Sequence, residues 1–454
     1  MSRRAEVGLD SSEIPTAASS SSIAYRRYAL AILTIINLLA YLDRSVINIL
    51  AEPIKRSLHL ADWQIGMMTG VAFAAFYTVL GIPIARLAER YSRPRIIGIA
   101  IAIWSALTVL CGFARNFAQL FAARVGVGFG EAGFNPSAIS MVTDDTPGTR
   151  RAFALSVYSL GSYLGSVTGF ALGGIVAGVF GWRSAFFIAG APGLLFALLA
   201  ALTLNEPRLR DRNRASTQPS SLSDTIAQLA HKRAYWLICC ASACATFLSS
   251  SGAAFVAPFY LRNHTHEIAQ IAHDLKLTSI GFLGLALGGG VLMGAIGSLI
   301  GGRTADWASQ RDLRALLVVP AFAALAAVPV NISWMLSPSA IIALPLFYVS
   351  LLLSGFWFGP LYAATQGLVP VDARATSAAI QFLIASVVGL GLGPLTLGGL
   401  SDLYAHSLGL GPAGGLRWAF VTCELITLTL ALLLLIARRA VVADANTQPD
   451  RRQR

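Results

Sequence analysis

The sequence predicts an all-α, polytopic membrane protein with twelve transmembrane helices in two pseudo-symmetric bundles of six. Three observations predict this fold. The composition is too apolar for a soluble protein, apolar segments of membrane-spanning length recur along the chain, and two short motifs repeat between its halves.

The composition identifies the bilayer as the main solvent of the chain. Of the 454 residues, 55% are hydrophobic and 12% are charged, and the mean hydropathy is +0.65. Soluble domains carry about 25% charged residues. The net charge of +12 fits the excess of Lys and Arg on the cytoplasmic loops of membrane proteins. We therefore expect contact with membrane lipids and no nucleic-acid partner.

Twelve apolar segments are each long enough to cross roughly 30 Å of hydrocarbon. A polar linker rich in Arg and Ser, residues 205–233, separates six spans in residues 28–204 from six in residues 234–437. We expect residues 1–27 to form a disordered cytoplasmic tail and residues 438–454 a second cytoplasmic tail. The predicted spans are 28–50, 64–85, 96–114, 117–141, 152–179, 184–204, 235–261, 277–301, 315–335, 340–368, 376–400 and 416–437.

The orientation follows from the basic residues. They gather on the segments that face the cytoplasm if both termini are inside, as the positive-inside rule requires. The clearest groups are the linker, the pair Arg438 and Arg439, and the loop after the second span, which carries Arg86, Arg90, Arg93 and Arg95. We expect a multi-pass protein of the cell inner membrane with both termini cytoplasmic.

Two patterns recur between the halves. The second span of each half ends in a basic and acidic motif, Ala85–Arg90 in the first half and Gly302–Arg311 in the second, with Glu89 and Asp306 at the same place. The fourth span of each half is followed by Pro-x-x-x-Arg-Ala, which contains Arg151 and Arg374. Repeated halves are how transporters build a midplane site that opens to either side.

Four charged residues lie well inside predicted spans. Asp43 and Arg44 fall in the first span, and Arg124 and Glu131 in the fourth. An ionised group at the bilayer centre costs at least about 2.5–3.5 kcal/mol, so these side chains must face protein or water. A buried ion-pair network that only fixes helix packing is the alternative to a role in transport.

Their spacing predicts two polar stripes that line a cavity. Intervals of three, four and seven residues fall on one face of a helix. Asp43 projects about 100° away from its neighbour Arg44. A carboxyl in a poorly hydrated site can take up and release protons, whereas arginines stay charged. The stripes are Asn37, Tyr41, Arg44 and Asn48 on the first span, and Arg124, Glu131 and Asn135 on the fourth.

The sequence gives little support for nucleotide hydrolysis, metal binding or catalysis. No Walker pattern occurs, so uphill transport has to use an ion gradient. The histidines of the outer loop after span seven, with Glu267, match no standard zinc spacing, and we expect a solvated loop with no metal. We expect no cofactor. A membrane enzyme or receptor would need a nucleophile–base pair, metal-ligand spacing or a soluble domain. The chain is therefore not expected to be an enzyme.

The residues resemble the major facilitator superfamily, and more closely its spinster-like branch, across nearly all of positions 28 to 437. The motifs that carry the resemblance are Tyr-Leu-Asp-Arg at 41–44, Gly-Ile-Pro-Ile-Ala-Arg-Leu-Ala-Glu-Arg at 81–90, Trp104-Ser105, Arg-Val-Gly-Val-Gly-Phe-Gly-Glu-Ala-Gly at 124–133, and Gly-Leu-Gly-Leu-Gly-Pro at 389–394.

The resemblance implies roles for particular residues. It assigns proton coupling to Asp43 and Glu131, and substrate binding to Arg44 and Arg124, with Asn48, Asn135 and Tyr41 as further candidates from the stripes. It implies a gating role for the loop motifs. Ala85 and Glu89 depart from the usual Gly and Asp of that motif. The candidate gating residues are Glu89, Arg90, Arg93, Arg151, Asp306 and Arg374.

We therefore expect a monomeric secondary active transporter that works by alternating access and is coupled to protons. Spinster-like proteins are linked to lysophospholipids and sphingolipid-like solutes, and a neighbouring branch consists of organic anion:proton symporters. Two cavity arginines suit a phosphate or carboxylate headgroup. Proton-driven efflux of amphipathic compounds and passive facilitation remain alternatives.

Overall fold

The computed structural model describes residues 23–74, 83–84, 91–146, 150–206, 229–369 and 373–446, and these residues contain helices and no strand. The elements of the N-terminal half are α1 (Ile23–Leu58), α2 (Asp62–Gly66), the π-helix η1 (Met67–Val71), α4 (Arg93–Phe113), α5 (Phe117–Glu131), α6 (Phe134–Asp145), α7 (Arg151–Phe180) and α8 (Trp182–Thr203).

The elements of the C-terminal half are α10 (Arg233–Asn263), α11 (Thr265–Asp274), α12 (Ser279–Ser309), α13 (Ala315–Leu336), α14 (Ala340–Ser354), the 3₁₀ helix η4 (Gly355–Trp357), α15 (Phe358–Gly367), α16 (Arg374–Ile384), the π-helix η6 (Ala385–Gly391), α17 (Leu392–Ser407), α18 (Gly411–Cys423) and α19 (Leu425–Asn446).

The all-α membrane fold is confirmed. Within the described residues, ten continuous helical segments are long and apolar enough to cross a membrane. The second predicted span begins with α2 and η1 and runs into 75–82 and 85–90, which lie outside the described residues. The fourth predicted span is divided between α5 and α6.

Two helices extend beyond the predicted spans into segments expected to be tails. Helix α1 begins at Ile23 rather than at 28, and the Tyr25 hydroxyl near its start accepts a hydrogen bond from the Asn205 backbone amide. Helix α19 continues to Asn446, where the Asp444 carboxylate accepts from the Ala234 amide at the start of α10. These contacts stabilise helical turns that lie beyond the apolar residues. Hydropathy alone therefore placed the start of α1 too late and the end of α19 too early.

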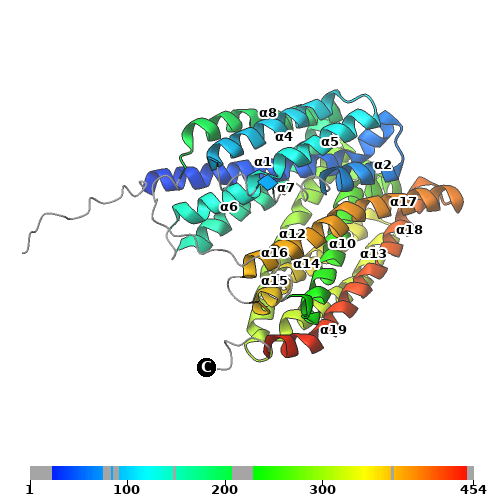
Figure 1. Ribbon diagram of the computed structural model, residues 1–454. Helices are drawn as coiled ribbons and strands as arrows, with labels where there is room; N and C mark the ends of the chain where they lie inside the picture. The colour runs from blue at the N-terminus through cyan, green and yellow to red at the C-terminus, as the bar shows by residue number, and fades with distance from the viewer. Residues whose placement is uncertain are drawn as a thin grey trace, which may run out of the picture.

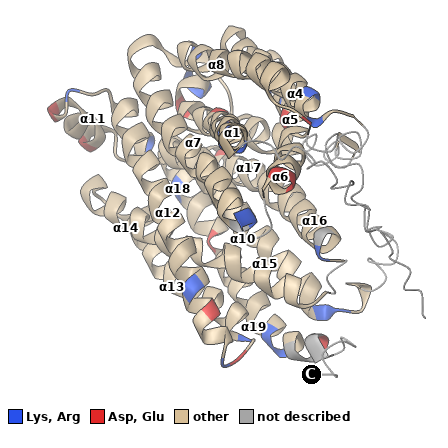
Figure 2. Ribbon diagram, turned by 90° about the vertical axis from the view of Figure 1, so that its left-hand side faces the viewer, with Lys and Arg blue, Asp and Glu red and all other residues tan. Residues whose placement is uncertain are grey.

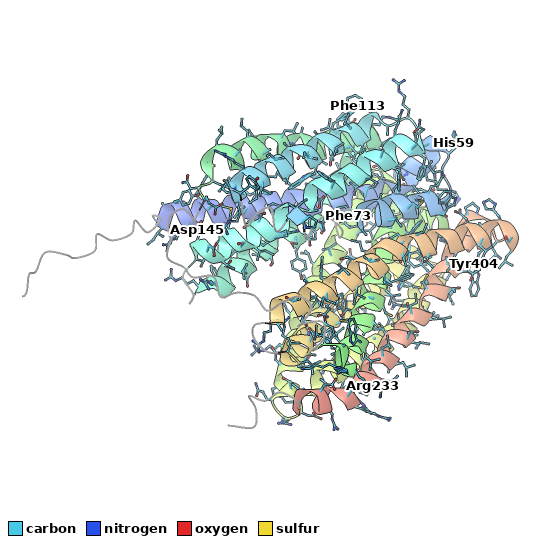
Figure 3. The ribbon with its side chains drawn as sticks, viewed as in Figure 1. His59, Phe73, Phe113, Asp145, Arg233 and Tyr404 are labelled. Carbon is cyan, nitrogen blue, oxygen red and sulfur yellow. The ribbon has the colours of Figure 1, made fainter. Side chains whose placement is uncertain are left out.

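Figure 1 shows two groups of helices. The N-terminal half (α1 to α8) forms the upper group, and α10 to α19 form the lower group. The groups meet where α2, α17 and α18 lie and diverge toward α6 and α19. Figure 3 places Phe73 between the groups, His59 and Tyr404 at the end where they meet, and Asp145 and Arg233 at the opposite end.

Glycines determine how closely the helices approach one another. Along α7, glycines at intervals of four residues face α1, and a Cβ added at Gly165 would lie 2.2 Å from the Leu38 carbonyl oxygen. Small residues at this spacing let helix backbones come into contact in lipid. Helix α1 is thereby fixed against α7, and with it the charged residues in its middle.

Charge is sparse along the helices (Figure 2). Lys, Arg, Asp and Glu side chains colour mainly helix ends and connections, while the long helices are otherwise uncharged. The few charged residues within the spans are therefore exceptions that need partners.

Candidate functional site

The first acid–base pair joins Arg44 of α1 to Glu131, the last residue of α5. Arg44 Nε donates to Glu131 Oε2 at 2.6 Å, and Nη2 lies 2.5 Å from the same oxygen. The guanidinium also lies over the rings of Phe73 and Tyr41, 4.4 Å and 5.0 Å from their centroids. A charge-assisted bond and two cation–π contacts thus hold Arg44.

The second pair joins Asp43 to Arg124 on another side of α1. Arg124 Nη1 lies 3.6 Å from Asp43 Oδ1, and the Thr108 hydroxyl of α4 donates to Asp43 Oδ2 at 2.8 Å. This ion pair is too long for a hydrogen bond. In the described part of the chain, Arg124 Nε and Nη1 and Asp43 Oδ1 have no hydrogen-bond partner. The hydrogen-bonding capacity of these buried polar atoms is therefore not used in this conformation.

The two arginines differ in access. The Arg44 side chain is 21% exposed, whereas the Arg124 side chain is 2% exposed and Asp43 and Glu131 are each 1% exposed. In this conformation Arg44 is the more accessible of the two arginines. Arg124 is enclosed behind it with Asp43.

Neutral polar residues surround these pairs. The Tyr158 hydroxyl of α7 donates to Asn135 Oδ1 at 2.6 Å, and the Asn37 amide donates to the Tyr158 carbonyl oxygen and the Ser162 hydroxyl. Tyr41 and Asn48 are half-buried on α1. The polar stripes of the first and fourth spans are therefore linked through α7.

The candidate gating residues are dispersed. Glu89 and Arg90 lie outside the described residues. Arg93, fully buried, binds Glu206 through its backbone amide and guanidinium and also binds Asp144 and Ser140. This clamp joins the ends of α4, α6 and α8 within one half.

The other gating candidates lie near the ends of their helices. Arg151 donates to the Thr146 carbonyl oxygen, and the Arg374 carbonyl oxygen accepts from Gln366. Asp306, with Arg303, lines a hollow of about 810 Å³ along α12 between Ser298 and Gln310. The structure does not bring these residues together with Arg93.

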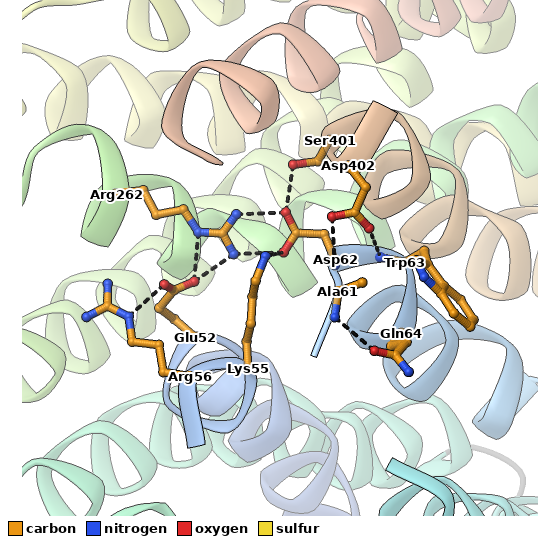
Figure 4. Close-up of polar contacts among 10 residues, drawn as sticks. All are labelled: Glu52, Lys55, Arg56, Ala61, Asp62, Trp63, Gln64, Arg262, Ser401 and Asp402. Atoms are coloured by element: carbon orange, nitrogen blue, oxygen red, sulfur yellow. Dashed lines mark hydrogen bonds and ion pairs between the residues drawn. The ribbon is translucent and has the colours of Figure 1, made fainter. Parts of the chain in front are cut away.

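An ion network that the sequence analysis missed joins the two halves at the end where they meet (Figure 4). Arg262, at the end of α10, binds Asp62 through both terminal nitrogens at 2.8 Å. Its Nε donates to Glu52 at 2.8 Å, and Lys55 Nζ lies 2.5 Å from Asp62. These side chains of α1, α2 and α10 form a buried contact between the halves.

Helix α17 completes this outer ion network. Ser401 donates to Asp62 Oδ2 at 2.7 Å, and the Asp402 carboxylate accepts from the backbone amides of Asp62 and Trp63 at 3.1 and 2.8 Å. Burial raises the pKa of Asp62, but the hydrogen bonds and charge of Arg262, with Lys55, outweigh it and lower the pKa to about 2. The carboxylate therefore stays ionised at physiological pH.

The network escaped sequence analysis because each member lies near the end of a span, where charged residues are ordinary. One signal was available. Glu52, Asp62 and Asp402 are acidic residues at the ends predicted to face outward, and Arg262 is an arginine on the side where the positive-inside rule predicts few basic residues. Acids and a base together on the outer side indicate pairing across the halves.

The outer loop after α10 also differs from expectation. It forms α11, in which the Glu267 carboxylate accepts from the Ser339 hydroxyl and the Ala340 amide at the start of α14. His264 is 4% exposed, and burial lowers its pKa. His264 and Glu267 are therefore packed against neighbouring helices, whereas His266 and His273 are exposed, as expected for a solvated loop.

Comparison with known proteins places this architecture in a family. The model of the Major Facilitator Superfamily matches residues 33–394. An MFS-type efflux pump of Mycolicibacterium smegmatis is 30% identical over 84% of this chain and 86% of its own length. Protein spinster homolog 3 of Danio rerio is 26% identical over 86% of this chain and 80% of its own length.

A solved structure agrees in fold and sequence. The crystal structure of a bacterial homolog to the human lysosomal transporter Spinster, in an inward-facing and unoccupied conformation, superposes with a TM-score of 0.82. It is 30% identical, and the match covers 93% of this chain and 99% of that one. The relatives are transporters and not enzymes. The chain belongs to the major facilitator superfamily and, within it, to the spinster-like branch.

Proposed function

We propose that this membrane transporter carries an organic anion or a lysophospholipid-like solute by alternating access, driven by protons. Asp43 and Glu131 exchange the protons, and Arg44 binds the anionic group. The observation that supports this proposal best is the Arg44–Glu131 pair, in which one guanidinium is bound to an enclosed carboxylate and is still 21% exposed.

The chemistry of this pair links the two events. An anion that binds Arg44 competes with Glu131 for the same guanidinium. A proton on Glu131 removes the negative charge that holds Arg44 and frees its donors for the solute. Proton binding and anion binding therefore favour each other.

The second pair extends the coupling to a part of the site that the solute does not reach in this conformation. Asp43 and Arg124 lie 3.6 Å apart with unbonded polar atoms, so a proton on Asp43 would release Arg124. Asn48, Asn135 and Tyr41 complete the binding surface. The motifs with Glu89, Arg90, Arg93, Arg151, Asp306 and Arg374 would form the inner gate.

The arrangement of the halves supports alternating access. The outer ion network closes the end where they meet, and the bacterial Spinster homolog with the same fold is inward-facing. We place both termini in the cytoplasm and the chain in the cell inner membrane as a monomer. Residues 28–204 and 234–437 would be the two units that rock against each other, joined by the linker 205–233.

Uptake into proteoliposomes tests the proposal. Solutes that raise the unfolding temperature of the purified protein would be selected from lysolipids, sugar acids and aromatic carboxylates. We expect the wild type to accumulate such a solute under an imposed pH gradient and Glu131→Gln to lose gradient-driven accumulation. Asp274→Asn, which removes a carboxylate that is 71% exposed at the end of α11, is the control and should remain coupled. Coupled uptake by Glu131→Gln would contradict the assignment.

Efflux of amphipathic compounds is the second candidate, because the relative from Mycolicibacterium smegmatis is an efflux pump. The same carboxylates would support efflux if the solute competes with the proton for them, because the two then move in opposite directions. Drug resistance that depends on expression of the wild type and is lost in Glu131→Gln would favour efflux over uptake.

A further inference from the structure

A third buried carboxyl lies in the C-terminal half, outside the site described above. Glu424 occupies the junction between α18 and α19, within the last span. It is 4% exposed. An ionised carboxylate at this depth is costly unless a cation offsets it.

The polar neighbours of Glu424 come from three helices and are neutral. Asn331 Nδ2 of α13 donates to Glu424 Oε1 at 3.0 Å, and Asn331 Oδ1 accepts from the Ser350 hydroxyl of α14. Thr427, one turn further along α19, donates its backbone amide to the Glu424 carbonyl oxygen at 2.9 Å. The carboxyl thus begins a hydrogen-bonded chain that runs from α19 through α13 to α14.

No cation offsets the charge of Glu424. In the described ranges Glu424 forms no ion pair, unlike Asp43 and Glu131. Its titratable neighbour is the thiol of Cys423, and Arg417 lies two turns toward the outer end of α18. From α10 the packing comes from Phe259, whose ring contacts that of Phe420.

We infer that Glu424 is a proton-binding site separate from Asp43 and Glu131. It holds its proton as a neutral carboxylic acid in the inward-facing state. Asn331 and Ser350 transmit the loss of that proton to α14. Burial without a cation makes the neutral form the stable one.

The loss of the Glu424 proton affects α14 because it changes the strength of the hydrogen bond to the carboxyl group. With the proton bound, Asn331 donates to a neutral group. When the proton leaves, the same bond becomes charge-assisted, hence shorter and about twice as strong. Asn331 is then drawn toward Glu424 and its link to Ser350 changes. Helix α14 leads directly into η4, the 3₁₀ turn that interrupts the tenth span, so a local bend is already present there.

Infrared spectroscopy of the full-length protein in lipid tests the inference, because a protonated carboxylic acid and a carboxylate absorb at different carbonyl stretching frequencies. We expect the spectrum at neutral pH to lose a carboxylic-acid band in Glu424→Gln and to keep its carboxylate bands. Glu206→Gln removes an arginine-paired carboxylate and should lose carboxylate bands instead. Loss of carboxylate bands in Glu424→Gln would overturn the inference.

Two further variants test the role of Asn331 and the independence of the Glu424 site. Asn331→Leu leaves Glu424 in place and should shift the frequency of the acid band, since a hydrogen bond to it is lost. An unshifted band would show that Asn331 transmits nothing. The double variant Asp43→Asn/Glu131→Gln should keep the Glu424 band even if coupled transport fails, and loss of that band would show that the sites are not separate.

Discussion

Asp43 and Arg44 are neighbours in sequence, yet they bind partners in different places. Helical geometry predicted that they point about 100° apart, and the structure encloses Asp43 while Arg44 stays 21% exposed. The sequence could not predict which acid pairs with which arginine. That choice depends on the register between α1 and α5, which tertiary packing sets.

Arg262 links the two halves in the outer ion network. It binds Asp62 and Glu52 across the halves while only 5% exposed. Removing one partner of a buried pair costs about 3 kcal/mol or more. We therefore predict that Arg262→Gln shifts the ratio of outer-closed to outer-open molecules by roughly 100-fold, seen as a longer distance between spin labels at positions 59 and 407 in a background without the native cysteines.

Arg56→Gln is the matched control. Arg56 also binds Glu52, but it is 67% exposed and lies on the same helix. Exposed pairs of this kind contribute about 0.3–0.5 kcal/mol, so the distance distribution should change little. Equal effects of the two substitutions would show that closure does not depend on the contact between the halves.

At the scale of elements, apolar run length predicted the spans but not their interruptions. The fourth span breaks at Ala132–Gly133, directly after Glu131, and the last breaks at Glu424. The eleventh contains η6, and η1 near the start of the second span is also a π-helix. Such irregularities are common at functional sites. They arise from local packing that composition does not record.

The contact between α2 and α17 yields a prediction at this scale. A Cβ added at Gly66 would lie 2.2 Å from the Pro394 carbonyl oxygen across the halves, whereas one at Gly399 would have nothing within 4 Å. Gly66→Ala should therefore separate the outer ends, measured with the same spin labels, while each half stays folded. Gly399→Ala should leave the distance unchanged. An unchanged distance in Gly66→Ala would mean that this contact does not limit closure.

At the scale of the whole molecule, Asp62 of the outer ion network does not supply the pH response. The lowered pKa of Asp62 means that its contribution to closure is fully present above its ordinary pKa of 3.8 and is lost only as the pH falls toward about 2. Between about pH 5 and about pH 8 the contribution of Asp62 is therefore constant. Asp43 and Glu131 remain as the carboxyl groups of the N-terminal half that can bind and release protons when a proton gradient is applied.

The distance between the halves as a function of pH tests this account most directly. Spin labels at positions 59 and 407 would be measured in lipid at about pH 5 and about pH 8, in the cysteine-replaced protein and in its Asp43→Asn/Glu131→Gln form. We predict a pH-dependent change in the outer-closed population of the former and the loss of most of that change in the latter. The same pH dependence in both would contradict proton coupling through Asp43 and Glu131.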